Sequence, residues 1–421
     1  MKKVALFYQL SLINLGFWLI YKMKLTEIKS KCFFTLLILV SVWSCEKKNK
    51  NDETQVVGSQ AVTLIIKHLP KTHNFNEDVY LSGDFEGWSG GSKRFKLKKE
   101  NRHYSITIPK YKETISFKFT KGNWDKVECK ANGNSIENRT YTFTKLKDTV
   151  YVSVASWSRV GKQNTPSTAT KNVHVFADSF NIPQLNRKRK ITIYLPPNYN
   201  ATNKKYPVLY IQDGQNVFDA STSYSGEWEV DETLNNLYNK TAIGFIAVAI
   251  NHGQEKRLNE YSAWDNKKYG KGEGALYLDF LVNTLKPEID KNYRTKPENQ
   301  NTAIVGASLG GLFAHYAAVN RPDVFAKAAI FSPSFWYAKQ SFQFTKNTSI
   351  LSTSKLYYLV GQKEDDVMIT PLKEMVTLLK YKGVTQDKLF QRIAENGTHS
   401  ETFWKTEFEM AIQWLFNIEK Q

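Results

Sequence analysis

The sequence predicts an α/β fold, a mostly parallel sheet with helices on both faces, preceded by a small all-β domain. Two hydrophobic patterns in the 421-residue chain support this prediction. Up to residue 158, short runs with period-two alternation, such as VTLIIKHL and HYSITIP, are separated by turn residues, which is typical of an antiparallel β-sandwich. From residue 172, near-continuous apolar strands alternate with helix-forming stretches, as expected for strands buried on both faces.

Residues 1–45 have the pattern of an export signal. Three lysines between residues 24 and 31 precede an apolar run, and the small Ser44 stands just before Cys45. The run of about a dozen residues is short for a bilayer span. Its end resembles a bacterial lipobox, in which Cys45 would be lipidated and become the mature N-terminus. An uncleaved anchor helix is the alternative.

The start of the mature chain follows from the same region. A second apolar stretch ends just before Met23, which suggests Met23 as the true start of translation. Residues 46–57 are polar without periodicity and predict a solvated tether. We therefore expect an exported protein, anchored to a membrane through a lipid, in the periplasm or at the cell surface.

Three segments follow the tether. Residues 58–158 form the predicted sandwich, residues 159–171 contain a proline and no hydrophobic period and so predict a linker, and residues 172–421 form the α/β domain. In such a domain the chemistry lies at the carboxyl ends of the strands. Strands are expected within residues 188–197, 206–214, 245–250, 302–308, 326–334, 355–361 and 389–394, and helices around Leu276 to Leu285 and from Leu309, Pro371 and Glu401.

Charge and cysteine content limit the classes of function. The formal net charge of +18, with lysines spread over every segment, predicts a basic surface and acidic or anionic partners. Nucleic acid is not an expected partner, because no nucleic-acid-binding motif accompanies the charge. Cys129 is the only cysteine after Cys45, which excludes a disulfide framework and a cysteine-rich metal site in the two domains. We expect neither a metal nor an organic cofactor.

The stretch Gly306-Ala307-Ser308-Leu309-Gly310 has the layout of a nucleophile elbow. An apolar strand precedes it and a helix-forming run follows it. The serine of an elbow takes a strained conformation, and its neighbours two positions away must be nearly free of side chains. We predict that Ser308 is a nucleophile. The alternative is a small residue in a tight turn.

A serine nucleophile needs a base and an acid, which in an elbow of this type follow it in the order serine, acid, histidine. Only His315 and His399 come after Ser308, and His315 lies two turns along the same predicted helix. His399, in the polar stretch ENGTHSETFW, is therefore the expected base. The acid should follow the strand KLYYLV, where Glu364, Asp365 and Asp366 are consecutive, and position alone leaves the three open.

The predicted reaction also needs two backbone N–H donors for an oxyanion. Leu309, directly after the nucleophile, supplies one by position. The other is expected after the strand YIQDG, where Gly214 allows a turn, and we assign it to the amide of Gln215. Asp213 has no ligand partner at metal-binding spacing, so we do not expect it to bind a metal.

Several stretches together resemble one family. The stretches YIQDGQNVFD, GEWEVDETL, RLNEYSAW, TLKPEIDKNYRT, GASLGG and SPSFWYA, in this order, resemble the bacterial putative esterases of the α/β-hydrolase fold, which include siderophore esterases and relatives of feruloyl and acetyl-xylan esterases. The resemblance covers about residues 172–418 and implies a serine carboxylic ester hydrolase without a cofactor. It implies Glu364 as the acid, three positions after a glycine. It also implies substrate-pocket residues Arg257, Tyr261 and Trp336, for which structural packing is the alternative.

The N-terminal domain has its own resemblance. VYLSGDFEGWS and the later ISFKFTKGNWDKVECKANGNSIENRTYTF are similar to starch-binding and glycogen-binding β-sandwich modules, which stack sugars on tryptophans. This implies α-glucan binding through Trp88, with Trp124 as a substitute for a second tryptophan, because Cys129 stands where that residue is expected. The alternative is an immunoglobulin-like spacer.

The predicted function is hydrolysis of a carboxylic ester, on a small molecule or a polysaccharide or oligosaccharide, through Ser308, His399 and an acid. A siderophore-type ester is the alternative substrate. A non-catalytic glycan-binding lipoprotein is the alternative of another class.

Overall fold

The computed structural model describes residues 60–419, except 132, 134, 135, 137, 159–165, 224, 225, 351, 352 and 365. The predicted signal region 1–45 with Met23 and Cys45, the tether and the first part of the linker lie outside the described residues. Residues Ser59–Gln421 form one compact unit. Among the helices in the described part of the chain, none has the length and apolar character needed to cross a membrane.

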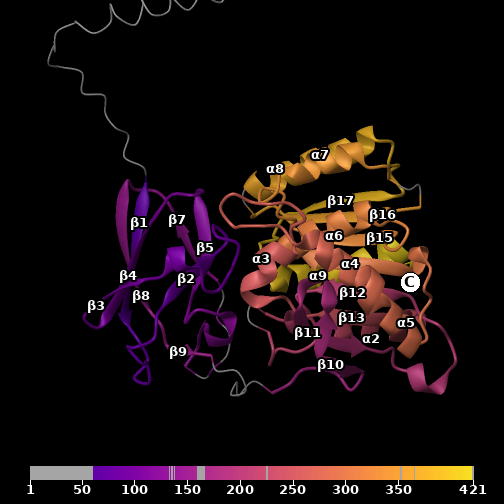
Figure 1. Ribbon diagram of the computed structural model, residues 1–421, viewed down its shortest axis with the longest axis horizontal. Coiled ribbons are helices and arrows are strands. Elements are labelled where there is room, and N and C mark those ends of the chain that lie inside the picture. The colour runs from indigo at the N-terminus through magenta and orange to yellow at the C-terminus, as the bar shows by residue number, and fades with distance from the viewer. Residues whose placement is uncertain are drawn as a thin grey trace, which may run out of the picture. The chain divides into compact units, whose positions relative to one another are not determined.

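An all-β region occupies the first part of the described chain (Figure 1). Its core strand is β1, where Val62, Leu64 and Ile66 are buried and the residues between them are half-buried, which is the predicted period-two pattern. β1 pairs antiparallel with β4 and parallel with β8. The strands are β1 Ala61–His68, β2 Tyr80–Gly83, β3 Lys98–Glu100, β4 His103–Pro109, β5 Thr114–Thr120, β6 Glu128–Cys129, β7 Arg139–Thr142, β8 Lys147–Ser153 and β9 Ser156–Trp157.

These strands form the predicted sandwich, except that β1 and β8 pair parallel rather than antiparallel. The sheet β3-β4-β1-β8 and the sheet β2-β5-β7 share one apolar core, to which both sheets contribute, and β6 pairs with β9. Cys129 is a buried free cysteine at the end of β6. Burial raises the pKa of its thiol, which favours the unreactive protonated form.

The second half of the chain is built on an eight-stranded sheet of order β10-β11-β13-β12-β14-β15-β16-β17. β10 and β11 pair antiparallel at one edge, and the strands from β13 to β17 are parallel, so the predicted α/β class is confirmed. The strands are β10 Val173–Ile182, β11 Arg187–Tyr194, β12 Val208–Gln212, β13 Ile246–Ile250, β14 Thr302–Ala307, β15 Lys327–Phe331, β16 Lys355–Gly361 and β17 Leu389–Ala394.

Helices cover both faces of this sheet (Figure 1). One apolar layer joins the strands to α4, α5, α6 and α8, and the other joins them to α2 and α9. The central strands are buried at every position, as expected for a sheet covered twice. The helices are α2 Val230–Thr241, α3 Arg257–Glu260, α4 Gly274–Phe280, α5 Lys286–Asn292, α6 Leu309–Asn320, α7 Gln340–Asn347, α8 Asp366–Tyr381 and α9 Glu401–Phe416, and the π-helical turn Leu281–Leu285 joins α4 to α5.

The structure differs from the sequence prediction in the start of one helix and in elements that were not predicted, among them β10, α2, α5 and α7. α8 begins at Asp366 rather than Pro371, because a proline in the second turn costs one backbone hydrogen bond but does not prevent a helix that buries its apolar face. The helix α2 was not predicted, because its sequence VDETLNNLYNKT is mostly polar and buries only a narrow stripe.

Candidate active site

Ser308 lies in the turn between β14 and α6, with φ 58° and ψ −122°. This is a strained backbone for a residue with a side chain, as an elbow requires. A Cβ on Gly306 would lie 2.2 Å from the carbonyl oxygen of Gly310, so the two glycines let strand and helix meet closely. The Ser308 amide donates to Phe331 O on the next strand at 2.9 Å, which fixes the turn.

The structure brings the three residues Ser308, His399 and Glu364 together. Ser308 Oγ lies 3.0 Å from His399 Nε2, and His399 Nδ1 lies 2.8 Å from Glu364 Oε2. Each of the three follows the carboxyl end of a parallel strand, β14, β16 or β17. With a proton on Nδ1 donated to Glu364, Nε2 carries a lone pair directed at the serine hydroxyl.

Glu364 is held by more than the histidine. Its Oε1 accepts from Ser332 Oγ at 2.6 Å and from the Gly361 amide at 2.9 Å, and its side chain is buried. Ser332 Oγ in turn accepts from Trp404 Nε1 at 2.9 Å. Of the other two predicted acids, Asp366 is exposed at the start of α8, and Asp365 lies outside the described residues.

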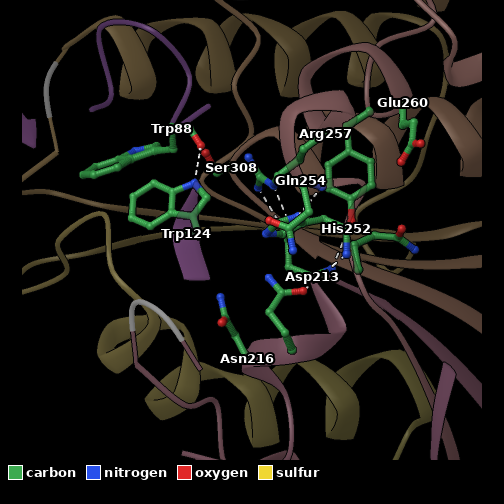
Figure 2. Close-up of polar contacts among 12 residues, drawn as sticks. Trp88, Trp124, Asp213, Asn216, His252, Gln254, Arg257, Glu260 and Ser308 are labelled. Carbon is green, nitrogen blue, oxygen red and sulfur yellow. Dashed lines mark hydrogen bonds and ion pairs between the residues drawn. The ribbon is translucent and has the colours of Figure 1, made fainter. Parts of the chain in front are cut away.

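The predicted oxyanion turn follows β12 as a 3-10 turn, Gly214–Asn216. Asp213 precedes it in a left-handed conformation, and a Cβ on Gly214 would lie 2.6 Å from the Ile250 amide nitrogen. The Asp213 carboxylate forms a bidentate ion pair with Arg257 at 2.7 and 2.8 Å, drawn in Figure 2. Burial acts to raise the pKa of Asp213, but the Arg257 guanidinium holds it below its usual range. Asp213 is therefore an anchor for the turn.

Two cavities open at Ser308 and His399. The smaller, of about 70 Å³, also contacts Gln215, and the larger, of about 600 Å³, also contacts Leu309. Each of the two residues predicted to supply an amide donor therefore borders one of the two cavities at Ser308. The smaller cavity is further lined by Trp88, Trp124, Asn138, Asp213, Asn216, Trp228, His252, Arg257, Ala307, Glu401 and Trp404.

The all-β region supplies part of both linings. Trp124 is 5% exposed, its Nε1 donates to Trp88 O at 2.8 Å, and the two rings lie 5.8 Å apart beside Ser308 (Figure 2). The loop that carries Trp88 is packed closely, since a Cβ on Gly87 would lie 2.5 Å from Leu258 Cδ2. The two tryptophans predicted as a sugar platform therefore border the cavity at the candidate nucleophile.

The predicted pocket residues divide. Arg257 borders the smaller cavity and Trp336 the larger one. The prediction for Tyr261 is wrong: in the described structure it borders neither cavity, because its ring is 1% exposed and packs on Tyr277 and Phe313. Its hydroxyl accepts a hydrogen bond from the Asp213 amide at 3.0 Å, so Tyr261 helps to hold the turn that follows β12.

Several residues at the site were missed by the sequence analysis. Glu401, the first residue of α9, borders the smaller cavity, and burial raises the pKa of its carboxyl to about 7. Burial lowers the pKa of the His252 imidazole to about 4, so this ring is neutral near pH 7. Ser334 Oγ lies 3.3 Å from Ser308 Oγ. The only sequence signal for these residues was their position after strand ends.

One group of described residues has the side chains to hold a metal ion: Glu227, Asp231 and Glu232, at and before the start of α2. No metal was expected from the sequence, and these three residues were not among the predicted site residues.

Comparison with known proteins identifies the family of this chain. The model of the family described as "Putative esterase" matches residues 182–415. The protein YbbA of Bacillus subtilis is 27% identical over 241 residues, covering 54% of this chain and 92% of that protein. An endo-1,4-beta-xylanase/feruloyl esterase of Xylanibacter ruminicola is 26% identical over 228 residues, covering 53% of this chain and 29% of that protein.

The fold has solved counterparts. The BES protein from Bacillus cereus has a TM-score of 0.50 at 22% identity, covering 61% of this chain and 98% of that chain. The family match spans more than half of the sequence and contains Ser308, Glu364 and His399. The chain therefore belongs to the putative esterase family and is a carboxylic ester hydrolase.

Proposed function

We propose that this hydrolase acts through Ser308 as nucleophile, His399 as general base and Glu364 as the acid that orients it. The observation that carries the proposal is the continuous chain of 3.0 and 2.8 Å contacts from Ser308 Oγ through His399 to Glu364. A hydroxyl is a weak nucleophile until a neighbouring base removes its proton, and this arrangement supplies that base.

In the first half of the reaction, Ser308 Oγ forms a bond to the ester carbonyl carbon while its proton moves to His399 Nε2. The carbonyl oxygen becomes an oxyanion, which the Leu309 and Gln215 amides stabilise by hydrogen bonds. The carbon–oxygen bond to the alcohol then breaks, and the alcohol leaves with the proton from Nε2. In the second half, water attacks the acyl-serine with the same proton transfers and releases the acid. The Glu364 carboxylate stabilises the imidazolium formed in each step.

The proposed substrate is an acyl ester of a polysaccharide or oligosaccharide. A cavity of about 600 Å³ is large enough for a substituent of drug-like size, which p-nitrophenyl acetate would not fill. Trp88 and Trp336 border it, and aromatic faces bind sugar and phenolic rings. The feruloyl esterase named above is consistent with this class of ester.

A siderophore-type ester is the second candidate, and a specific observation favours it. Lys112, Lys268 and Lys363 border the larger cavity, where Lys112 is ion-paired with Asp84 at 2.7 Å, in a chain of formal net charge +18. Such a lining attracts an anionic substrate, and ferric catecholate complexes are anionic. A neutral acetylated or feruloylated sugar gains less from these lysines.

A substrate panel separates the two candidates. Purified protein is incubated with feruloylated and acetylated oligosaccharides and with ferric tricatecholate triesters, with the Ser308→Ala variant as the blank, and the released acid is measured by chromatography. If the substrate is a glycan ester, kcat/KM on at least one glycan ester should exceed kcat/KM on every siderophore ester. The reverse order supports the second candidate. Release at equal rates by Ser308→Ala contradicts the proposed mechanism itself.

A further part of the proposal concerns the predicted export signal at residues 1–45. We propose that Cys45 is lipidated and anchors the enzyme, since the basic, apolar and small-residue pattern before it matches such a signal. The test is incorporation of a clickable fatty acid in the producing cell. Labelling of the wild type and its loss in Cys45→Ala support the anchor, and equal labelling of both contradicts it.

A further inference from the structure

Glu227, Asp231 and Glu232 place their carboxylates in one cluster on the hydrolase region. One ligand oxygen from each lies within 4.8 Å of those from the other two. Asp231 and Glu232 belong to the first turn of α2, and Glu227 comes just before it. Acidic residues in a first helical turn are common and are favoured by the helix dipole alone, so the cluster needs a second observation before it indicates a site.

That observation is the state of Asp231. Its side chain is 0% exposed, and its Oδ1 has no hydrogen-bond partner within the described structure, while Oδ2 accepts from the Thr170 amide at 2.8 Å. The buried Glu232 Oε2 and Thr170 Oγ1 also lack a partner there. A buried carboxylate oxygen without a donor carries a large desolvation cost, and such atoms call for an explanation by an ion or water.

The cluster also lacks a compensating cation. No lysine or arginine of the described chain forms an ion pair with any of the three carboxylates, although the chain is strongly basic. Three clustered carboxyl groups without a basic partner, beside a buried and unsatisfied oxygen, are an arrangement that a bound cation stabilises.

The donor atoms indicate the class of cation. All three are carboxylate oxygens, and the Thr168 hydroxyl lies beside them, since Thr168 Oγ1 donates to Glu227 at 2.8 Å. Oxygen donors without histidine or cysteine suit hard cations such as Ca²⁺ and Mg²⁺ rather than Zn²⁺. Ca²⁺ accepts several protein carboxylates at once, whereas Mg²⁺ usually keeps several of its waters.

We propose that Glu227, Asp231 and Glu232 bind one divalent cation, for which Ca²⁺ is the best fit. The ion would hold together the segment that carries Thr168 and Thr170, the start of α2, and Glu227 just before that helix. Trp228, next to Glu227, borders the smaller cavity at Ser308. The site is therefore a structural one that holds a wall of the candidate active site, and its ion takes no part in the reaction.

The test is binding of Ca²⁺ to the full chain after treatment with EDTA. Isothermal titration with CaCl₂ should give a stoichiometry of about one, and saturating Ca²⁺ should raise the midpoint of thermal unfolding by about 5 °C. Asp231→Asn and Glu232→Gln should each abolish the titration heat. Glu374→Gln, which removes an exposed carboxylate from α8, is the matched control and should bind as the wild type does.

The response to Ca²⁺ separates a cation site from a purely structural cluster. In EDTA, Glu232→Gln should melt close to the wild type, because neither protein holds an ion and the amide has nearly the shape of the carboxyl group. In Ca²⁺ only the wild type should melt at a higher temperature, because only the wild type gains the ion. The proposal is overturned if the folded wild type shows no titration heat and no change of melting midpoint with 10 mM Ca²⁺. It is also overturned if both cluster variants bind Ca²⁺ as well as the wild type does, or if the wild type responds to Mg²⁺ or Mn²⁺ but not to Ca²⁺.

Discussion

Gly361 and Gly397 hold two loops of the candidate site in backbone contact. A Cβ on Gly361 would lie 2.2 Å from the Gly397 carbonyl oxygen, and the Lys363 amide donates to that same oxygen at 3.0 Å. Glu364 follows the first glycine by three residues and His399 follows the second by two. The 2.8 Å contact between Glu364 and His399 therefore depends on the two glycines, because a side chain at either position would push the loops apart. Neither glycine takes part in the reaction.

Replacement of Gly361 by alanine should separate these loops. We expect kcat on p-nitrophenyl acetate to fall about 10- to 100-fold, because small displacements of reacting groups have effects of that size. Gly244→Ala is the control: its Cβ would also be crowded, by Pro196 at 2.8 Å, but it lies away from Ser308. Both variants should lose stability in thermal unfolding, and only Gly361→Ala should lose kcat. Equal kcat in the two variants would contradict this role for the glycine pair.

Glu364→Gln tests the choice of acid. Without the carboxylate, His399 loses the acceptor that fixes its tautomer, and kcat should fall about 10⁴-fold while the protein remains folded. Asp366→Asn, two residues away and exposed, should keep kcat within about twofold. The comparison uses burst-free steady-state hydrolysis at pH 7.5. A larger loss of kcat in Asp366→Asn than in Glu364→Gln would show that Glu364 is not the acid.

Trp88 tests whether the all-β region takes part in substrate binding. Trp88→Ala should raise KM for a feruloylated oligosaccharide about 10-fold, the effect of losing one aromatic contact, and should leave kcat/KM on p-nitrophenyl acetate within about twofold. Tyr151→Ala is the control, since this ring of β8 is 63% exposed and lies in the same region. Unchanged KM for every bulky ester in Trp88→Ala would remove the region from the binding site.

Glu401 predicts a dependence of stability on pH. Its pKa of about 7 in the folded protein is above the value of an unfolded glutamate, so the folded state holds the proton more tightly. The associated stabilisation is complete below about pH 4.5 and is lost as the pH rises through 7. Glu401→Gln should therefore be more stable than the wild type at pH 8 by about 1–3 kcal/mol and nearly equal to it at pH 4.5.

Thermal unfolding at the two pH values, followed by circular dichroism, measures this difference. Glu395→Gln removes an exposed carboxylate from the loop just before α9 and should follow the wild type at both pH values. The same pH dependence in Glu401→Gln and the wild type would contradict the raised pKa.

Local patterns were sufficient for the parts of this molecule that depend on near neighbours in sequence. The elbow at Ser308 was predictable because strand, glycines and helix are contiguous, and His399 followed from chain order. Position did not select among the three acids, since the choice depends on the turn that directs Glu364 back to the Gly361 amide. Resemblance alone assigned it.

Long-range contacts account for what was missed. Phe85 O accepts from Lys268 Nζ at 3.1 Å and from Tyr269 OH at 2.9 Å, across about half of the described chain. No periodicity in either segment indicates such a contact. Tyr261 was misassigned for the same reason: its loop position suggested a pocket, whereas the ring enters a core assembled from distant aromatic residues.

The most direct measurement is hydrolysis of p-nitrophenyl acetate by residues 46–421 and by the same protein with Ser308→Ala. We predict that the wild type hydrolyses the ester and that the folded variant has a kcat lower by about 10⁵- to 10⁶-fold, because without the nucleophile no acyl-serine can form. A variant that hydrolyses the ester as fast as the wild type would contradict the assignment of Ser308 and, with it, the proposed mechanism.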